Sequence, residues 1–293
     1  MKNIAIIGAG VVGTAIGYLL QRAGYTIVGV GSRTLESAER SRDFIGQGEV
    51  STDLALIAGK ADIVFITTSD DAVQEVCEKI SSQGGFQEGS LVVHTSGALS
   101  AESLVSAKSS RAKIASLHPL QSLPSVQEAL NNMPGSFFCL EGDPEALDTA
   151  REMLRVFQGR ELTIEKGSKP LYHAGAAAVS NFLVATIGLG LELHSAAGIN
   201  RQDSLKALLP LIQGTIKNTQ QLGIPDALTG PIARGDVRTV RDHLESISRV
   251  KPVLLGLYIE LGRLTVNLAL EKGTLDTEAA KEILDLFDQH QSR

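Results

Sequence analysis

Short apolar runs of strand length alternate with amphipathic helical stretches over the first part of the chain. The first run, Asn3 to Ile7, leads through a glycine turn into a helical pattern from Val11 to Ala23. Further strands are expected at residues 26–30, 61–68, 90–94, 112–117, 136–141 and 161–164, with helices at 34–45, 69–80 and 144–157. This alternation predicts an α/β fold with an open, mostly parallel, doubly wound sheet and helices on both faces.

The hydrophobic pattern changes at Lys166 to Pro170. Every later apolar stretch has helical period, at residues 171–198, 202–222, 236–248, 251–270 and 277–289. A single sharp break, Pro225 to Asp236, contains two prolines and two glycines. We therefore expect two domains, an α/β domain at residues 1–165 and an all-α domain at residues 166–293.

The glycine turn after the first strand has the spacing of a dinucleotide-binding crossover. Gly8 permits the tight turn, Gly10 lets the backbone approach a pyrophosphate, and Gly13 lets the helix lie close to the strand. The cofactor would rest on the amides of the following helix N-terminus. This predicts a Rossmann domain whose cofactor loop is Gly8, Ala9, Gly10, Val11, Val12 and Gly13. The alternative is a glycine turn needed only for packing.

The second strand ends in Ser32, Arg33 and Thr34, where an NAD-selective enzyme would usually place a carboxylate for the ribose hydroxyls. The Arg33 guanidinium can hold a 2'-phosphate with two hydrogen bonds, and the neighbouring hydroxyls can donate to it. We therefore favour NADP over NAD. In the alternative interpretation Arg33 is a solvated charge and Ser32 only caps the next helix. S-adenosylmethionine is a less favoured ligand, because its ribose would also want a carboxylate here.

Polar side chains follow three of the predicted strands. Ligands of open parallel sheets bind beyond the carboxyl ends of the strands, near the point where the strand order reverses. The polar clusters at these ends are Thr67, Thr68 and Ser69, then His94 to Gly97, and then Ser116 to Gln121. We add the first cluster to the predicted cofactor site.

His118 is the residue that we expect to be catalytic. A histidine titrates near neutrality, so it can exchange a proton with a substrate hydroxyl as hydride moves. Ser96 ends the neighbouring strand and could orient the substrate oxygen or the nicotinamide amide. The alternative for His118 is a structural hydrogen bond within its loop, and His94 is expected to pack inside its strand.

Three residues of the helical region are further candidates. His173 and Asn181 are eight residues apart in a predicted long helix and could border one cleft. Asn181 needs a hydrogen-bond partner, either a neighbouring helix or a ligand. Arg234 lies between prolines and glycines in a turn and could clamp an anionic substrate group, or be a solvated or helix-capping arginine.

Composition excludes several other classes of protein. A net charge of -6 without a basic run argues against nucleic acid binding, and the six histidines lack metal-ligand spacing. Cys77 and Cys139 are far apart and are expected to be reduced thiols of a cytoplasmic protein, with no room for a signal peptide before the first strand. Residues 170–191 carry no Asp, Glu, Lys or Arg; we expect a helix buried on all sides in protein rather than a membrane span.

Five stretches together resemble a bacterial family that joins a Rossmann-like domain to a helical C-terminal domain of unknown function. They are Gly8 to Gly13, His94 to Ser100, Ser116 to Ser122, Tyr172 to Val184 and Thr229 to Asp236. Members are often named as NADP-dependent oxidoreductases of the 6-phosphogluconate dehydrogenase-like superfamily. The resemblance implies a homodimer joined by the helical domain, and it supplies no substrate.

Two relatives in that superfamily offer residue roles. Prephenate dehydrogenases have a His-Pro loop whose histidine contacts the substrate hydroxyl, with a serine after the preceding strand, and His118 with Ser96 is similar in order. Hydroxyacid dehydrogenases carry a helical lysine four residues before an asparagine. Asn181 resembles that asparagine, but Ala177 occupies the lysine position, so the resemblance shifts the proton-donor role to His118 or His173.

The sequence thus predicts an NADP-dependent oxidoreductase that acts on a small carbonyl, imine or hydroxy acid, which could be anionic. The alternative is a non-catalytic NADP-binding sensor or assembly protein, because a fold alone does not establish an activity.

Overall fold

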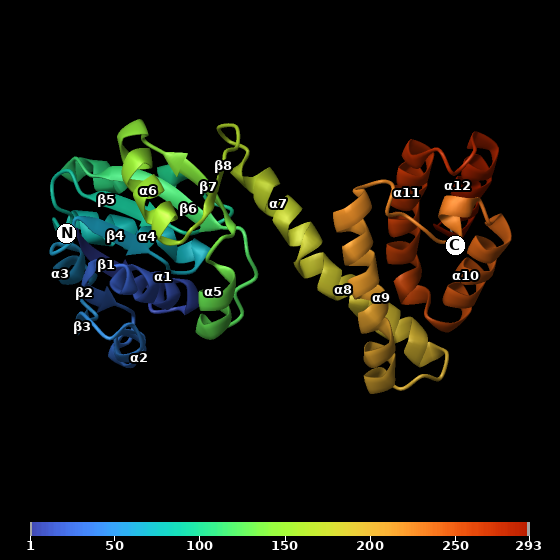
Figure 1. Cartoon of the computed structure of the whole chain (residues 1–293), viewed down its shortest axis with the longest axis horizontal. Coiled ribbons are helices and arrows are strands. Elements are labelled where there is room, and N and C mark those ends of the chain that lie inside the picture. The colour runs from blue at the N-terminus through green and yellow to red at the C-terminus, as the bar shows by residue number, and fades with distance from the viewer. Residues whose placement is uncertain (1, 292–293) are drawn as a thin grey trace. The chain divides into compact units, whose positions relative to one another are not determined.

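The computed structural model describes residues 2–291 and divides between Ser180 and Asn181 into two compact units. The first unit is α/β and the second is helical (Figure 1). The last strand ends at Leu162, near the predicted boundary at residue 165, but the next helix still belongs to the first unit.

The sheet of the first unit has eight strands in the order β3-β2-β1-β4-β5-β6-β7-β8. Neighbouring strands are parallel except β6 and β7, which are antiparallel, so the predicted mostly parallel sheet is confirmed. The strands are β1 Asn3–Ile7, β2 Thr26–Gly31, β3 Glu49–Ser51, β4 Ile63–Ile66, β5 Leu91–His94, β6 Lys113–Pro119, β7 Phe137–Gly142 and β8 Arg160–Leu162.

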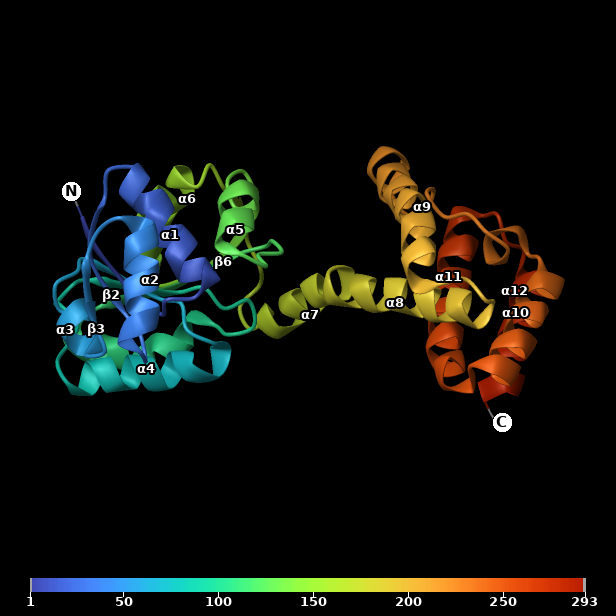
Figure 2. The same ribbon diagram turned by 90° about the horizontal axis from the view of Figure 1, so that it is seen from below.

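Helices cover both faces of this sheet (Figure 2). They are α1 Val11–Arg22, α2 Leu35–Ile45, α3 Leu54–Ala58, α4 Asp70–Ser82, α5 Val126–Asn132 and α6 Pro144–Val156, with a 3-10 stretch, η1, at Ala101–Ser110. The last helix of the unit is α7 Lys169–Val179. Successive strand residues point to opposite faces, so the central strands β1 and β4, which are covered on both faces, are apolar at consecutive positions.

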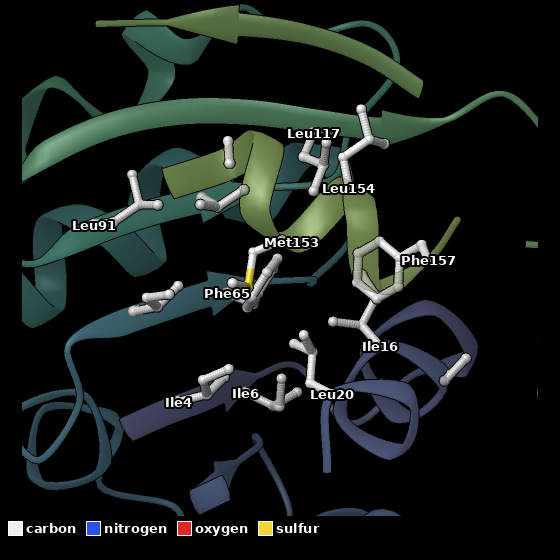
Figure 3. Close-up of a cluster of buried hydrophobic side chains, with 14 of the residues drawn as sticks. Ile4, Ile6, Ile16, Leu20, Phe65, Leu91, Leu117, Met153, Leu154 and Phe157 are labelled. Atoms are coloured by element: carbon white, nitrogen blue, oxygen red, sulfur yellow. The ribbon is translucent and has the colours of Figure 1, made fainter. Parts of the chain in front are cut away.

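Two separate hydrophobic cores result. On one face, strand residues such as Ile6, Phe65 and Leu117 pack with α1, α2, α5 and α6. Figure 3 shows Met153 of α6 and Phe157, which follows that helix, in this cluster. On the other face, the alternate strand residues, such as Ala5, Val64 and Ile114, pack with α3, α4 and η1.

The second unit is built from five α-helices and two 3-10 turns. They are α8 Asn181–Ala196, α9 Arg201–Leu222, η2 Ile232–Arg234, α10 Val237–Val250, η3 Pro252–Leu254, α11 Leu255–Lys272 and α12 Thr277–Gln291. The core between α10, α11 and α12 includes Val240, Leu244, Ile259, Ile283 and Phe287, all fully buried.

The long helix expected at residues 171–198 is interrupted by a turn at Ser180, between α7, which ends at Val179, and α8, which begins at Asn181. The expectation that this segment is buried on all sides is also wrong for the single chain. In the single chain Phe182 is 64% exposed and Val184 is 70% exposed. Two stretches, Lys169–Ala196 and Pro252–Lys272, are long and apolar enough to cross a membrane by length and composition alone.

Candidate active site

The glycine loop between β1 and α1 is fastened to the end of β4. Gly8 has φ 112°, which favours glycine, and the Thr67 hydroxyl donates to its carbonyl oxygen at 2.7 Å. A Cβ at Gly13 would come within 2.3 Å of both Gly8 O and Thr67 Oγ1. Both glycines are therefore required by a close approach of backbone and side chain, as the sequence predicts.

A pocket of about 300 Å³ lies beside this loop at the carboxyl edge of the sheet. It brings together most of the predicted cofactor residues, namely Gly8, Ala9, Gly10, Ser32, Arg33, Thr67, Thr68 and Ser69. Thr34 instead accepts a hydrogen bond from the Ser37 amide and caps α2, and Ser37, which the sequence did not suggest, lines the pocket. Val11, Val12 and Gly13 form the first turn of α1 next to Gly10.

Three observations fit this pocket to a dinucleotide. The N-terminus of α1 has no side-chain cap, so its amides are available to a pyrophosphate. A Cβ at Gly10 would meet nothing within 4 Å, so space is open where the phosphates would approach. The Thr68 hydroxyl is buried without a hydrogen-bond partner within residues 2–291, and a bound ligand could supply one.

Polar side chains form a patch on one face of the sheet, where β5, β6 and β7 lie side by side. In the strand register His94 faces Ser116 and Ser116 faces Glu141, while His118 faces Cys139. These residues continue the face that packs on α4 and η1, but they lie nearer the carboxyl ends of β5 and β6. We call these five residues the polar patch.

The first turns of α7 contact the polar patch and complete a cluster around His118. The Tyr172 hydroxyl lies 2.8 Å from Nδ1 of His118, and the His173 and His118 rings are 6.1 Å apart between centroids. Gly97, after β5, lies against both histidines, since a Cβ there would be 2.7 Å from His118 Nε2 and 2.6 Å from His173 Cδ2. The structure thus brings together His118, His173 and Tyr172.

Burial lowers the pKa of His118 to about 4, and the positive charge of Lys169 lowers it further in the same direction. The sequence argument placed this pKa near neutrality, and the structure corrects it because the ring is largely desolvated. Burial also raises the pKa of Tyr172. At neutral pH both groups are therefore uncharged. We assign the donor role to Tyr172, because a phenol is the more acidic donor, and this assignment places the imidazole hydrogen on Nε2.

Ser96 and His94 shape the loop after β5. The Ser96 hydroxyl oxygen accepts hydrogen bonds from the amides of Ala98 and Leu99, both at 3.1 Å, which leaves its own hydrogen free to donate. His94 accepts from the Ser96 amide through Nδ1 and lies 3.0 Å from the Ser100 carbonyl through Nε2. His94 therefore packs as expected, and the loop that it closes presents Gly97.

Asn181 and Arg234 belong to the second unit. Asn181 is the first residue of α8 and is exposed, rather than buried among small residues as expected. Arg234 is exposed at the end of the short turn η2, before Gly235 at φ 67°. The ligand roles of both residues remain predictions from the sequence.

Two residues of the cluster, Lys169 and Tyr172, were not proposed as site residues from the sequence, and Gly97 was included there only as the end of the His94 to Gly97 stretch. Tyr172 and Lys169 lie on the same face of α7 as His173, at spacings of one, three and four residues. A helical projection of residues 169–179 would have grouped them. The contacts of Lys169 and Tyr172 with β6 depend on the packing of α7 against the sheet, which the sequence does not reveal.

Two family models match the chain and leave little of it unmatched. A Rossmann-like domain matches residues 2–119, and a "Domain of unknown function (DUF2520)" matches residues 136–265. Among curated proteins, none matches the chain.

Solved structures support the same organisation. A protein from Bacteroides fragilis named "putative NADP oxidoreductase" is 26% identical, with a TM-score of 0.73 over 91% of this chain and 98% of that one. A protein from Thermotoga maritima is 24% identical, with a TM-score of 0.70 over 92% and 99%. A reductive aminase from Aspergillus terreus, solved with NADPH and ethyl levulinate, is 16% identical, with a TM-score of 0.65 over 99% of each chain. The last two show a shared fold.

Gly10 and Gly13 of the loop are expected to respond differently to substitution by alanine. Gly13→Ala places a methyl against Gly8 O and Thr67 Oγ1, which should cost about 1–3 kcal/mol of unfolding free energy. Gly10→Ala meets no protein atom and should leave stability nearly unchanged, yet weaken NADPH binding by at least ~10-fold by obstructing the phosphates. Thermal unfolding and calorimetric titration measure both effects. Unchanged NADPH affinity in Gly10→Ala would contradict the assignment of the pocket.

Proposed function

We propose that this chain, a Rossmann-like protein with a DUF2520 domain, is an oxidoreductase that uses a nicotinamide dinucleotide. The observation that carries the proposal is the pocket, in which the glycine loop, an uncapped helix N-terminus and the orphaned Thr68 hydroxyl meet. The similarity to the Bacteroides fragilis protein, over nearly the whole length of both chains, supports it.

NADP is the proposed cofactor, in preference to NAD. Ser32, Arg33 and Ser37 line the pocket at the end of β2, where the adenosine ribose of a dinucleotide would lie. No carboxylate of the described residues lines this pocket, so nothing there would repel a 2'-phosphate. The guanidinium can bind that phosphate, and the two hydroxyls can donate to it.

The proposed reaction is hydride transfer between the nicotinamide and a small carbonyl, imine or hydroxy acid. Thr67 and Gly97 follow β4 and β5, and His118 is the next-to-last residue of β6; these three strands are neighbours in the sheet. Since strands are spaced about 4.8 Å apart, His118 lies two strands, about 10 Å, along the edge from the glycine loop's contact with β4. A dinucleotide extended along that edge would bring its nicotinamide toward the His118 cluster.

In this proposal His118 acts as a neutral hydrogen-bond donor. With Tyr172 donating to Nδ1, the Nε2 hydrogen can polarise a substrate oxygen or nitrogen as hydride arrives at the adjacent carbon. Hydride transfer leaves a negative charge on that atom, and the Nε2 hydrogen bond stabilises it until a proton from solvent neutralises it. Ser96 retains a hydroxyl hydrogen that can orient the substrate or the nicotinamide amide, as predicted from the sequence.

A homodimer formed through the helical unit is the proposed assembly. Phe182, Val184, Leu211 and Leu222 of α8 and α9 are each more than half exposed in the single chain. Monomeric proteins rarely leave this much apolar surface in water, and a second copy would cover it. We also propose a cytoplasmic location, which the free, buried thiols of Cys77 and Cys139 support.

Replacing Arg33 by Ala should weaken NADPH binding by about 10- to 100-fold, because a charge-assisted pair with the phosphate is lost. NADH binding should change little. Thermal shift and calorimetric titration with NAD, NADH, NADP and NADPH measure these affinities. Arg22→Ala, an exposed arginine at the end of α1, is the matched control. Tighter binding of NAD than NADP by the unmodified protein would overturn the proposed preference.

Replacing His118 by Ala should reduce kcat by about 10²- to 10⁴-fold in NADPH oxidation with a panel of oxo acids and imines. Tyr172→Phe should reduce kcat by about 10-fold, and NADPH affinity should change little in both variants. His243→Ala is the control, because His243 makes a similar 2.7 Å contact with Tyr258 in the second unit. Full activity in His118→Ala would exclude this mechanism, and NADPH binding without turnover would favour a sensor.

The pH profile gives an independent check on His118. The active form is the neutral ring, so kcat should be flat from about pH 8 down to pH 5 and fall as the pH drops through about 4. A loss of activity centred near pH 6.5 would show instead an ordinary, solvated histidine.

The unmodified protein should elute in light-scattering chromatography with twice the mass of one chain. Val184→Glu, which places a charge on α8, should shift it toward the monomer, whereas Val105→Glu on η1 should not. A monomer at all concentrations would contradict the dimer.

A further inference from the structure

Lys169, the first residue of α7, is almost completely buried, with 1% of its surface exposed. Its ammonium donates to the Ser116 hydroxyl at 2.6 Å. Within residues 2–291 no carboxylate comes within 4.0 Å of this nitrogen, so the charge has no direct ion-pair partner. Lys169 does not line the cofactor pocket, and it has no part in the proposed reaction at His118.

Such a lysine is costly for stability. Burial disfavours its charged form and lowers its pKa, and the nearby Cys139 and Glu141 offset only part of this effect. An apolar side chain of similar length would fill the same space without that cost. The presence of the lysine therefore calls for a role other than packing.

Resting on the function proposed above, we propose that Lys169 is a positioning residue that holds the first turn of α7 on β6 and so keeps the Tyr172 hydroxyl on Nδ1 of His118. It touches neither substrate nor cofactor in this role.

Two parallel contacts carry the proposal. Ser116 and His118 are two residues apart on β6 and point to the same face of the sheet. Lys169 and Tyr172 are three residues apart on α7 and point to the same side of the helix. The contacts Lys169 to Ser116 and Tyr172 to His118, at 2.6 and 2.8 Å, therefore fix both the height and the rotation of α7 on the strand.

The charge of Lys169, like its position, favours the hydrogen bond from Tyr172 to a neutral His118. After burial, it is the largest influence that lowers the pKa of His118. A neutral ring can accept from Tyr172, whereas a protonated ring has no acceptor at Nδ1. The titratable groups that surround this arrangement come from β5, β6, β7 and α7, and they are His94, His118, Cys139, Glu141, Tyr172 and His173.

The test compares Lys169→Met with Lys166→Met, which makes the same change at an exposed lysine three residues earlier. Nuclear magnetic resonance of the imidazole nitrogens, assigned with His118→Gln, reports the tautomer and the pKa of His118 without any substrate. In Lys169→Met the pKa of His118 should rise by about one pH unit, because a nearby positive charge is gone. The Nε2-H tautomer should give way to a mixture, because Tyr172 is no longer held. Lys166→Met should match the unmodified protein.

Stability separates this role from a merely structural one. Lys169→Met should leave the melting temperature nearly unchanged, because removal of an unpaired buried charge offsets the loss of the partner of the Ser116 hydroxyl. Where a substrate is known, kcat should fall by about 10-fold with little change in the KM for NADPH. An unchanged pKa and tautomer of His118 in folded Lys169→Met would overturn the proposal.

Ser116→Ala provides a second variant in case Lys169→Met does not fold. It removes the anchor but leaves the charge, so the tautomer should become mixed while the pKa of His118 remains low. If the tautomer is unchanged there, the proposal fails. The unmodified protein must also show the Nε2-H form, and an Nδ1-H form would overturn the proposal directly. Failure to bind NADPH would sink the proposed function alone, because the nitrogen spectra are read without cofactor.

Discussion

A polar patch on the face of a sheet has to be covered by groups that can hydrogen-bond to it, and this requirement determines where α7 lies. The hydrophobic alternation of β5, β6 and β7 gives way to His94, Ser116, His118, Cys139 and Glu141 near the edge. An apolar helix over this patch would leave buried polar atoms unpaired, each at a cost of about 1–3 kcal/mol. The first turns of α7 supply the partners of Ser116 and His118, so the same contacts hold the helix and build the candidate site. His94 and Glu141 pair instead with backbone groups between Ser96 and Ala101.

The cofactor pocket lies at the same edge for a topological reason. The chain runs from β1 outward to β2 and β3 and then crosses to β4 on the other side of β1. The chain therefore leaves β1 in one direction and β4 in the other, and the sheet edge between these two strands is a topological switch point. Thr67, after β4, holds the glycine loop, after β1, at this edge. A ligand that enters there meets backbone amides on one side and can extend toward the ends of β5 and β6. Cofactor and proton chemistry thus share one rigid support.

Much of this arrangement could be predicted from the sequence, because it depends on local pattern. The glycine spacing, the strands and the polar residues at three strand ends are short-range features, and the pocket unites most of the cofactor residues that they indicated. Lys169 and Tyr172 were missed because their importance depends on long-range packing of α7 against β6. The exposure of Phe182 and Val184 could not be predicted either, since composition reports that a helix is apolar and not what covers it.

The protonation state of His118 shows why a residue type alone is an incomplete guide to mechanism. Histidine in a sequence indicates a group that titrates near neutrality, and that property suggested a proton acceptor. In the structure the ring is desolvated and a buried lysine lies nearby, so both influences favour the neutral form. A neutral imidazole that accepts at one nitrogen must donate at the other. The environment therefore converts the residue from an expected base into a hydrogen-bond donor, which suits the stabilisation of negative charge developing on a substrate during hydride transfer.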